Sequence, residues 1–169
     1  MKKLICCTVI FIFLSSIVPA QEYTAVDGDS LLLGEQRLRL DGIDAPEFTQ
    51  NCYTADGFEY ACGLKALQYL ADLLVEADVR CDCAPKPDIY NRRVCECFAD
   101  DISLNQAMVY AGYAMSYRSE KYTAAEQNAK SAKRGIWQGK FMRPALYRAL
   151  ERAREKKKQK ELSVKPRNE

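Results

Sequence analysis

Four closely spaced cysteines constrain the fold of this 169-residue chain more than any other feature. Cys81 and Cys83 end one β-like segment, and Cys95 and Cys97 lie in another. If the two segments form an antiparallel hairpin, one register places Cys81 opposite Cys97 and Cys83 opposite Cys95. Because side chains alternate between the faces of a strand, all four cysteines then share one face. The spacing predicts a β-hairpin closed by two disulfides.

Residues 1–20 have the pattern of a secretory signal peptide. The positive pair Lys2-Lys3 precedes an apolar run over residues 4–18, and small residues end the segment. We expect cleavage before Gln21 and a secreted or periplasmic monomer without stable membrane association. A membrane anchor is the alternative, but the apolar run is short for spanning a bilayer.

Six cysteines follow this segment, and an even number in an exported chain indicates three disulfides. With the hairpin pairs assigned, Cys52 would pair with Cys62 across a loop. Zinc binding by the four hairpin cysteines is the alternative. Their single intervening residues are tighter than the usual spacing of zinc ligands, and an oxidising compartment favours disulfides.

The chain contains no histidine, which excludes several kinds of catalytic site. Without imidazole there is no Ser/His/Asp triad, no Cys/His pair and no histidine-ligated zinc. Acid–base chemistry near neutral pH must use a carboxylate, a metal-bound water, a lysine or a tyrosine.

Positive charge is concentrated at the C-terminal end. After residue 20 there are 23 basic and 23 acidic residues, but residues 143–169 hold ten basic and four acidic ones. Proteins that bind nucleic acid by electrostatics alone usually have a strongly basic body. Phosphate binding here should therefore depend on a metal and a few placed arginines. The basic run over residues 152–160 is most simply a solvated helix face, and a nonspecific phosphate contact is its alternative.

The pattern of strands and helices predicts an α+β fold. It predicts a five-stranded OB-type Greek-key β-barrel with about three packed helices and a basic C-terminal helix. We expect a signal peptide over residues 1–20, a domain over 21–142 and the basic helix and tail over 143–169. The expected strands cover residues 22–26, 30–33, 37–43, 78–83 and 93–98. The expected helices are one over residues 63–75, one opened by Ser103-x-x-Gln106 and closed by Gly112, one opened by Thr123-x-x-Glu126 and closed by Gly135, and one beginning at Pro144.

Carboxylates and arginines gather near turns or a proline, which would fix their directions. Such a set suits binding a divalent cation and splitting a phosphodiester. Each residue has a simpler interpretation by itself: Asp27-Gly28 is a common turn pair, and isolated arginines are mostly surface charges. The set as a whole favours a site. Its members are Asp29, Arg39, Asp44, Glu47 and Arg92.

Four motifs, taken in order, resemble the thermonuclease, or staphylococcal nuclease-like, family. Together they span roughly residues 23–142. Asn91 replaces the glycine usual in this family, and asparagine tolerates a left-handed conformation. The motifs are Asp27-Gly28-Asp29-Ser30, Arg39-x3-Ile43-Asp44-Ala45-Pro46-Glu47, Asp88-x-Tyr90-Asn91-Arg92 and Ala132-Lys133-Arg134-Gly135-Ile136-Trp137.

The resemblance implies an OB-fold endonuclease that hydrolyses DNA and RNA with little sequence preference and leaves 3′-phosphate ends. It implies dependence on Ca²⁺, with Mg²⁺ and Mn²⁺ as alternative ions. Asp29, Asp44 and the main-chain carbonyl of Ala45 would be the metal ligands.

The resemblance also implies roles for the remaining residues. Glu47 would position or deprotonate the attacking water, and Arg39 and Arg92 would hold the phosphate. Tyr90 would contact the nucleotide. A catalytically silent OB-fold module that binds nucleic acid or a protein partner is the main alternative, and an exported binding domain unrelated to nucleic acids is a third. The intact set of carboxylates and arginines favours the enzyme.

Overall fold

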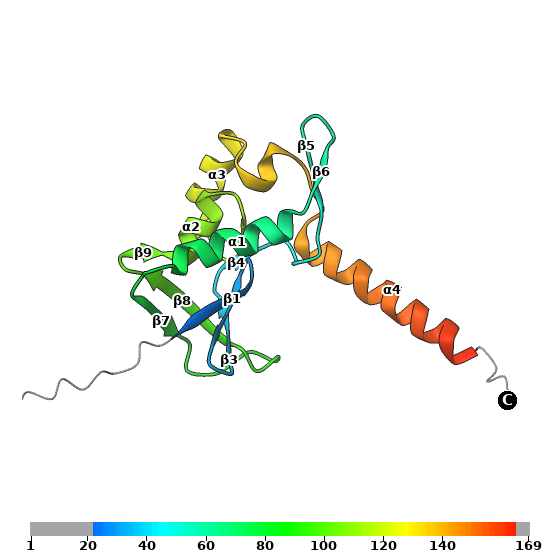
Figure 1. The fold of residues 1–169 in the computed structure, drawn as a ribbon, viewed down its shortest axis with the longest axis horizontal. Coiled ribbons are helices and arrows are strands. Elements are labelled where there is room, and N and C mark those ends of the chain that lie inside the picture. The colour runs from blue at the N-terminus through cyan, green and yellow to red at the C-terminus, as the bar shows by residue number, and fades with distance from the viewer. Residues whose placement is uncertain (1–21, 165–169) are drawn as a thin grey trace, which may run out of the picture.

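The computed structural model describes residues 22–164, so the expected signal peptide lies outside the described residues. Figure 1 shows a body of sheet and helices from which one long helix projects. Within residues 22–164, no helix combines the length and apolar character needed to cross a bilayer. The helices are α1 (Cys62–Leu74), α2 (Leu104–Tyr110), α3 (Thr123–Ser131) and the projecting α4 (Pro144–Val164), with a 3₁₀ turn at Gly135–Gln138.

The main sheet has the strand order β1-β2-β3-β8-β7, with β9 paired to β8. Its neighbours are antiparallel except β3 and β8, which run parallel. Two smaller sheets join β10 to β4, and β11 to β5 and β6. The strands are β1 (Tyr23–Asp27), β2 (Ser30–Leu33), β3 (Gln36–Leu40), β4 (Ile43–Asp44), β5 (Cys52–Thr54), β6 (Glu59–Tyr60), β7 (Val79–Cys83), β8 (Arg93–Ala99), β9 (Ile102–Ser103), β10 (Met115–Ser116) and β11 (Gly139–Lys140).

The α+β class and the four helices agree with the sequence, but the closed five-stranded barrel is not confirmed. Among the described strands, β1 and β7 are edges that do not pair with each other. The strand expected over residues 37–43 also divides in two. A turn at Asp41-Gly42, where Gly42 has φ 70°, ends β3 and lets β4 pair with β10 instead.

The β7–β8 hairpin has the cysteine register that the sequence indicates. Cys81 lies opposite Cys97, and Cys83 lies opposite Cys95. Their sulfur atoms are 2.06 and 2.02 Å apart, which are bonding distances. Cys52 and Cys62 form a third disulfide with a sulfur separation of 1.92 Å. The six cysteines of the described chain therefore leave no thiolate for zinc.

Two helix ends follow the sequence, and both ends of α3 depart from it. Ser103 caps α2 by accepting from the Gln106 N–H at 3.3 Å, and α4 begins at Pro144. The expected cap at Thr123 is wrong, because Tyr122 is the N-cap of α3 and Thr123 lies inside the helix. The helix also ends before Gly135: Lys133 has φ 52°, and the Arg134 N–H donates to the Ala129 carbonyl at 3.0 Å. This six-residue closure ends α3 without a glycine.

Close packing around Gly28 sets the position of the candidate site. The core lies between the sheet and helices α1 and α2, with Leu31, Leu40 and Leu70 fully buried. A Cβ atom on Gly28 would lie only 2.7 Å from the Cβ atoms of both Ala45 and Ala66. Three small residues therefore let the β1–β2 turn, the segment after β4 and helix α1 meet at one point.

Candidate active site

The β1–β2 turn presents a buried carboxylate to the segment after β4. The turn is held by the Asp29 N–H, which donates to the Asp27 carboxylate at 3.0 Å. Asp29 is only 6% exposed, and its Oδ2 accepts from the Ala45 N–H at 2.8 Å. Ser30 contributes its hydroxyl to the other oxygen at 3.2 Å. Hydrogen bonds thus satisfy Asp29 from the main chain and a neighbouring side chain.

Arg39 joins the two buried aspartates. It lies on β3 opposite Ser30 in the β2–β3 register, and its guanidinium forms an ion pair with Asp29. Its Nη2 donates to the Ile43 carbonyl at 2.8 Å and to Asp44 Oδ1 at 3.4 Å. Burial lowers the pKa of Arg39, and the Asp44 carboxylate acts in the opposite direction. Neither buried carboxylate is left without a positive partner, as burial requires.

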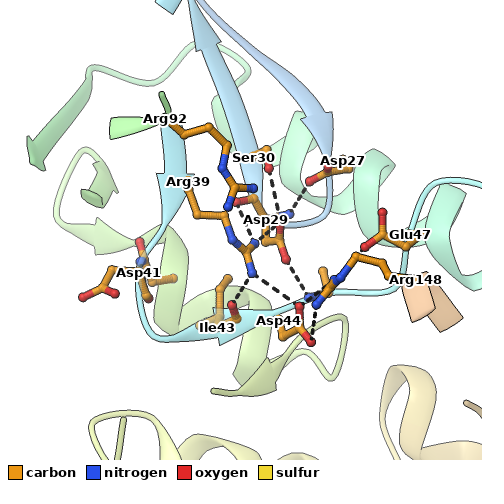
Figure 2. Close-up of polar contacts among 12 residues, drawn as sticks. Asp27, Asp29, Ser30, Arg39, Asp41, Ile43, Asp44, Glu47, Arg92 and Arg148 are labelled. Carbon is orange, nitrogen blue, oxygen red and sulfur yellow. Dashed lines mark hydrogen bonds and ion pairs between the residues drawn. The ribbon is translucent and has the colours of Figure 1, made fainter. Parts of the chain in front are cut away.

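A second arginine reaches the site from α4, as Figure 2 shows. Arg148 donates to both carboxylate oxygens of Asp44, at 3.0 and 3.3 Å, and to Glu47 Oε1 at 2.6 Å. Desolvation acts to lower the pKa of Arg148, but the hydrogen bonds with Asp44 and Glu47 outweigh it and raise the pKa above its usual value. The Arg148 guanidinium therefore supplies the positive charge that the carboxylates of Asp44 and Glu47 attract.

Two further contacts fix the start of α4 against the loop that carries Glu47. Gln50 donates its side-chain amide to the Met142 carbonyl at 2.7 Å. The Tyr147 hydroxyl lies 3.2 Å from the Thr49 hydroxyl. The sequence analysis missed Arg148 because it placed residues 143–169, as a basic helix and tail, outside the expected domain. The only sequence signal is its place, one turn after the helix start at Pro144.

The loop carrying Glu47 rests on the first turn of α1. Gln50 accepts from the Glu47 N–H at 3.3 Å and donates its own N–H to the Glu47 carbonyl at 2.7 Å. A Cβ atom on Gly63 would lie 1.7 Å from that carbonyl oxygen, so only glycine fits there. The Glu47 side chain is 33% exposed and therefore reaches solvent at the edge of the site.

Arg92 approaches Arg39 from the opposite side to Arg148 (Figure 2). Asp88 holds it in place, accepting from Arg92 Nε at 2.9 Å and from Nη2 at 2.7 Å. The other Asp88 oxygen accepts the backbone N–H groups of Tyr90 and Arg92, and Asn91 has φ 59° in the turn between them. Desolvation works to raise the pKa of Asp88, but these hydrogen bonds hold it below its usual value. Asp88 is thus a positioning residue to which the sequence analysis gave no role.

Tyr90 lies beside Arg92 and is 69% exposed. The Arg92 guanidinium carbon is 5.3 Å from the centre of the Tyr90 ring, within the range of a cation–π contact. The ring is therefore accessible from solvent next to a candidate phosphate-binding arginine. Contact with a nucleotide remains a prediction.

The arrangement suits a hard divalent cation by the chemistry of its donors. Within residues 22–164, no group of three or more histidine, cysteine or acidic side chains is placed to hold a metal. The predicted set of metal ligands has only two such side chains, Asp29 and Asp44, and its third ligand is the main-chain carbonyl of Ala45. Both carboxylates are more than nine-tenths buried, and both form ion pairs with guanidinium groups. Buried oxygen donors that demand positive charge fit calcium, provided that Arg148 releases Asp44.

The fold and this site together define a nuclease-like α+β domain with a buried network of aspartates and arginines. Residues 37–139 match the family model described as "Staphylococcal nuclease homologue", and the chain belongs to that family. The match contains Arg39, Asp44, Glu47 and Arg92 and ends before α4.

The chain is also similar to the succinoglycan biosynthesis protein ExoI of Rhizobium meliloti (strain 1021). The two are 34% identical over 119 residues, which cover 68% of this chain. The chain spans 62% of the length of that relative.

Proposed function

We propose that this protein is an exported, calcium-dependent endonuclease that hydrolyses DNA and RNA with little sequence specificity and leaves 3′-phosphate ends. One observation carries the proposal: Arg39 links the buried carboxylates of Asp29 and Asp44. Membership of the staphylococcal nuclease family supports the reaction type. Three disulfides support an oxidising compartment.

Arg39 on β3 and Arg92, just before the neighbouring strand β8, would hold the phosphate. A phosphodiester resists attack because its negative charge repels the nucleophile. Arg39 is rigidly held by main-chain and carboxylate acceptors, and Arg92 is held by Asp88. A guanidinium is a planar fork of donors that matches two phosphate oxygens, and each arginine would exchange part of its present hydrogen bonds for the phosphate. Loss of one such donor typically lowers the rate by about 10²–10³-fold.

Glu47 would receive the proton of the attacking water. Its carboxylate is partly exposed, so water can reach it and donate a proton to it. It must exchange its contact with Arg148 for one with water. Asp29, Asp44 and the Ala45 carbonyl would hold calcium. When bound, calcium would draw charge off the phosphoryl oxygens.

A catalytically silent binding module is the second candidate, and the position of Arg148 favours it. Arg148 engages both Asp44 and Glu47, the two residues that catalysis requires to be available. In a silent module this pairing would be permanent, and nucleic acid or a protein partner would bind elsewhere. The two candidates differ in whether calcium can displace the arginine.

A digest of plasmid DNA and of RNA separates the candidates. We expect cleavage by the wild-type protein in calcium, none in chelator, and a large loss of rate in E47Q. The exposed Glu35 provides a matched control, E35Q, which should cleave like wild type. Cleavage insensitive to chelator and to E47Q would refute calcium-dependent hydrolysis at this site. Nucleic-acid binding without cleavage in any divalent metal would favour the silent module.

A further inference from the structure

Helix α4 extends the domain beyond the part matched by the family, and it leaves the body at the candidate site. The family match ends at residue 139, whereas α4 covers Pro144–Val164. Figure 1 shows the helix projecting away from the sheet after its first turns. Arg148, in the second turn, is the residue that contacts Asp44 and Glu47. The helix face that carries Arg148 is therefore turned toward the site.

Basic residues continue along that face. Arg148, Arg152, Lys156 and Lys160 are spaced four residues apart, so they form one row along the helix. A rise of about 1.5 Å per residue makes this row about 18 Å long. Each step of four residues turns the row by about 40°, so its members lie within a sector of about 120°. Uncharged residues fill the rest of this sector: Ala145, Ala149, Gln159 and Ser163.

The acidic residues of α4 lie outside the sector, and two of them are paired with other cations. Arg154 donates to Glu151 at 2.6 Å, and Lys157 lies 4.0 Å from Glu161. Within residues 22–164, Arg152, Lys156 and Lys160 form no ion pair, and all three are exposed. These three exposed members therefore present positive charge that no ion pair offsets, and they continue the row away from the site, where Arg148 is paired with Asp44 and Glu47.

We propose that this row binds the sugar–phosphate backbone of a nucleic-acid strand whose scissile phosphate lies at the candidate site. Charge complementarity identifies the ligand as a polyanion, and continuity with Arg148 places one end of it at Asp44 and Glu47. Such contacts carry no base information, which agrees with the low sequence preference proposed above. The inference rests on the proposed function for the identity of the strand, but its test requires no cleavage.

The experiment measures binding of a fluorescently labelled single-stranded oligonucleotide by anisotropy, in chelator, from about 50 to about 200 mM salt. The variant R152Q/K156Q/K160Q removes the three exposed members of the row. Its matched control, R154Q/K157Q/K158Q, removes three charges from the opposite side of the same helix. Glutamine preserves helix propensity in both, and circular dichroism verifies that each remains folded.

We expect the row variant to lose at least tenfold in affinity at about 50 mM salt, and its slope of log affinity against log salt to fall by about 2. In the control variant, the loss of log affinity and the fall in salt slope should each be less than half of those in the row variant. Equal losses in the two variants would mean diffuse charge and would overturn the proposal. So would unchanged binding in the row variant.

A lipid surface is the rival ligand, because α4 also exposes Leu146 and Leu150. Vesicles containing phosphatidylserine provide the second arm. Binding of wild-type protein to these vesicles but not to the oligonucleotide would overturn the proposal. Failure of cleavage in every metal, together with selective loss of binding in the row variant, would refute the endonuclease and leave the row standing. Cleavage in calcium, together with equal binding by the row variant and its control, would support the endonuclease and overturn the proposal for the row.

Discussion

Arg148 and Asp44, 104 residues apart in sequence, form a two-point ion pair with distances of 3.0 and 3.3 Å. The Asp44 side chain is 5% exposed and that of Arg148 is 31% exposed. The pair thus satisfies a buried carboxylate with a cation that enters from the surface. Because the same carboxylate is an expected metal ligand, Arg148 and calcium should compete for it.

Removing this competitor should strengthen metal binding. In R148Q, we expect calcium affinity by titration calorimetry to rise about tenfold, equivalent to about 1.4 kcal/mol. Without metal, the variant should lose about 1–2 kcal/mol of stability, because Asp44 is left buried with only Arg39, and calcium should restore part of it. The control R154Q alters a cation on the same helix that does not reach the site. Equal calcium affinity in R148Q and wild type would contradict the competition.

Asp88 should stabilise the protein in a pH-dependent manner. Its folded-state pKa lies below its usual value, so its contribution is complete above about pH 4 and disappears as the pH falls through the folded-state pKa. We expect the free energy of unfolding of D88N to be about 1 kcal/mol lower than that of wild type near neutral pH. The difference should shrink below about pH 4 in denaturant titrations. D56N, at an exposed turn, should match wild type throughout; a constant difference for D88N would count against the ion pair.

Gly63 should not tolerate a side chain, because its surroundings leave no room for a Cβ atom; its backbone conformation is not the reason. In G63A, the new Cβ would collide with the Glu47 carbonyl, and we expect a loss of about 1–3 kcal/mol in thermal or denaturant unfolding. Glu47 should also be displaced, which lowers cleavage. Gly34 offers a comparison, since it has φ 58° and open space around it. G34A should cost about 1 kcal/mol and leave cleavage intact. Wild-type stability in G63A would show that the Glu47 loop moves freely.

The sequence predicts those features that depend on local spacing. The β7–β8 register follows from two Cys-x-Cys pairs, because a strand has a side-chain period of two. The Ser103 cap follows from a side chain that bonds its own helix. The cap at Thr123 fails because the buried Tyr122 precedes the helix in its place. Local patterns of equal strength can therefore be overridden by packing.

Arg148 illustrates what the sequence could not provide. Its place in the site depends on long-range contacts of Tyr147 in α4 with Thr49, and of Met142 just before α4 with Gln50, which no periodicity encodes. The motif residues could be named because they resemble those of a family, yet their roles remain predictions. The closed barrel is not confirmed, because β1 and β7 remain edges of the described sheet. The Asp41-Gly42 turn also ends β3 early, and β4 pairs with β10.

The most direct test of the central claim is the rate of DNA cleavage as calcium is titrated, comparing D44N with D41N. Both changes remove one carboxylate charge, but Asp44 is buried in the network and Asp41 is exposed three residues away. We predict that D44N loses at least about 10²-fold in rate and most of its calcium response, whereas D41N behaves as wild type. Cleavage by D44N at the wild-type rate, with the same calcium response, would contradict the account.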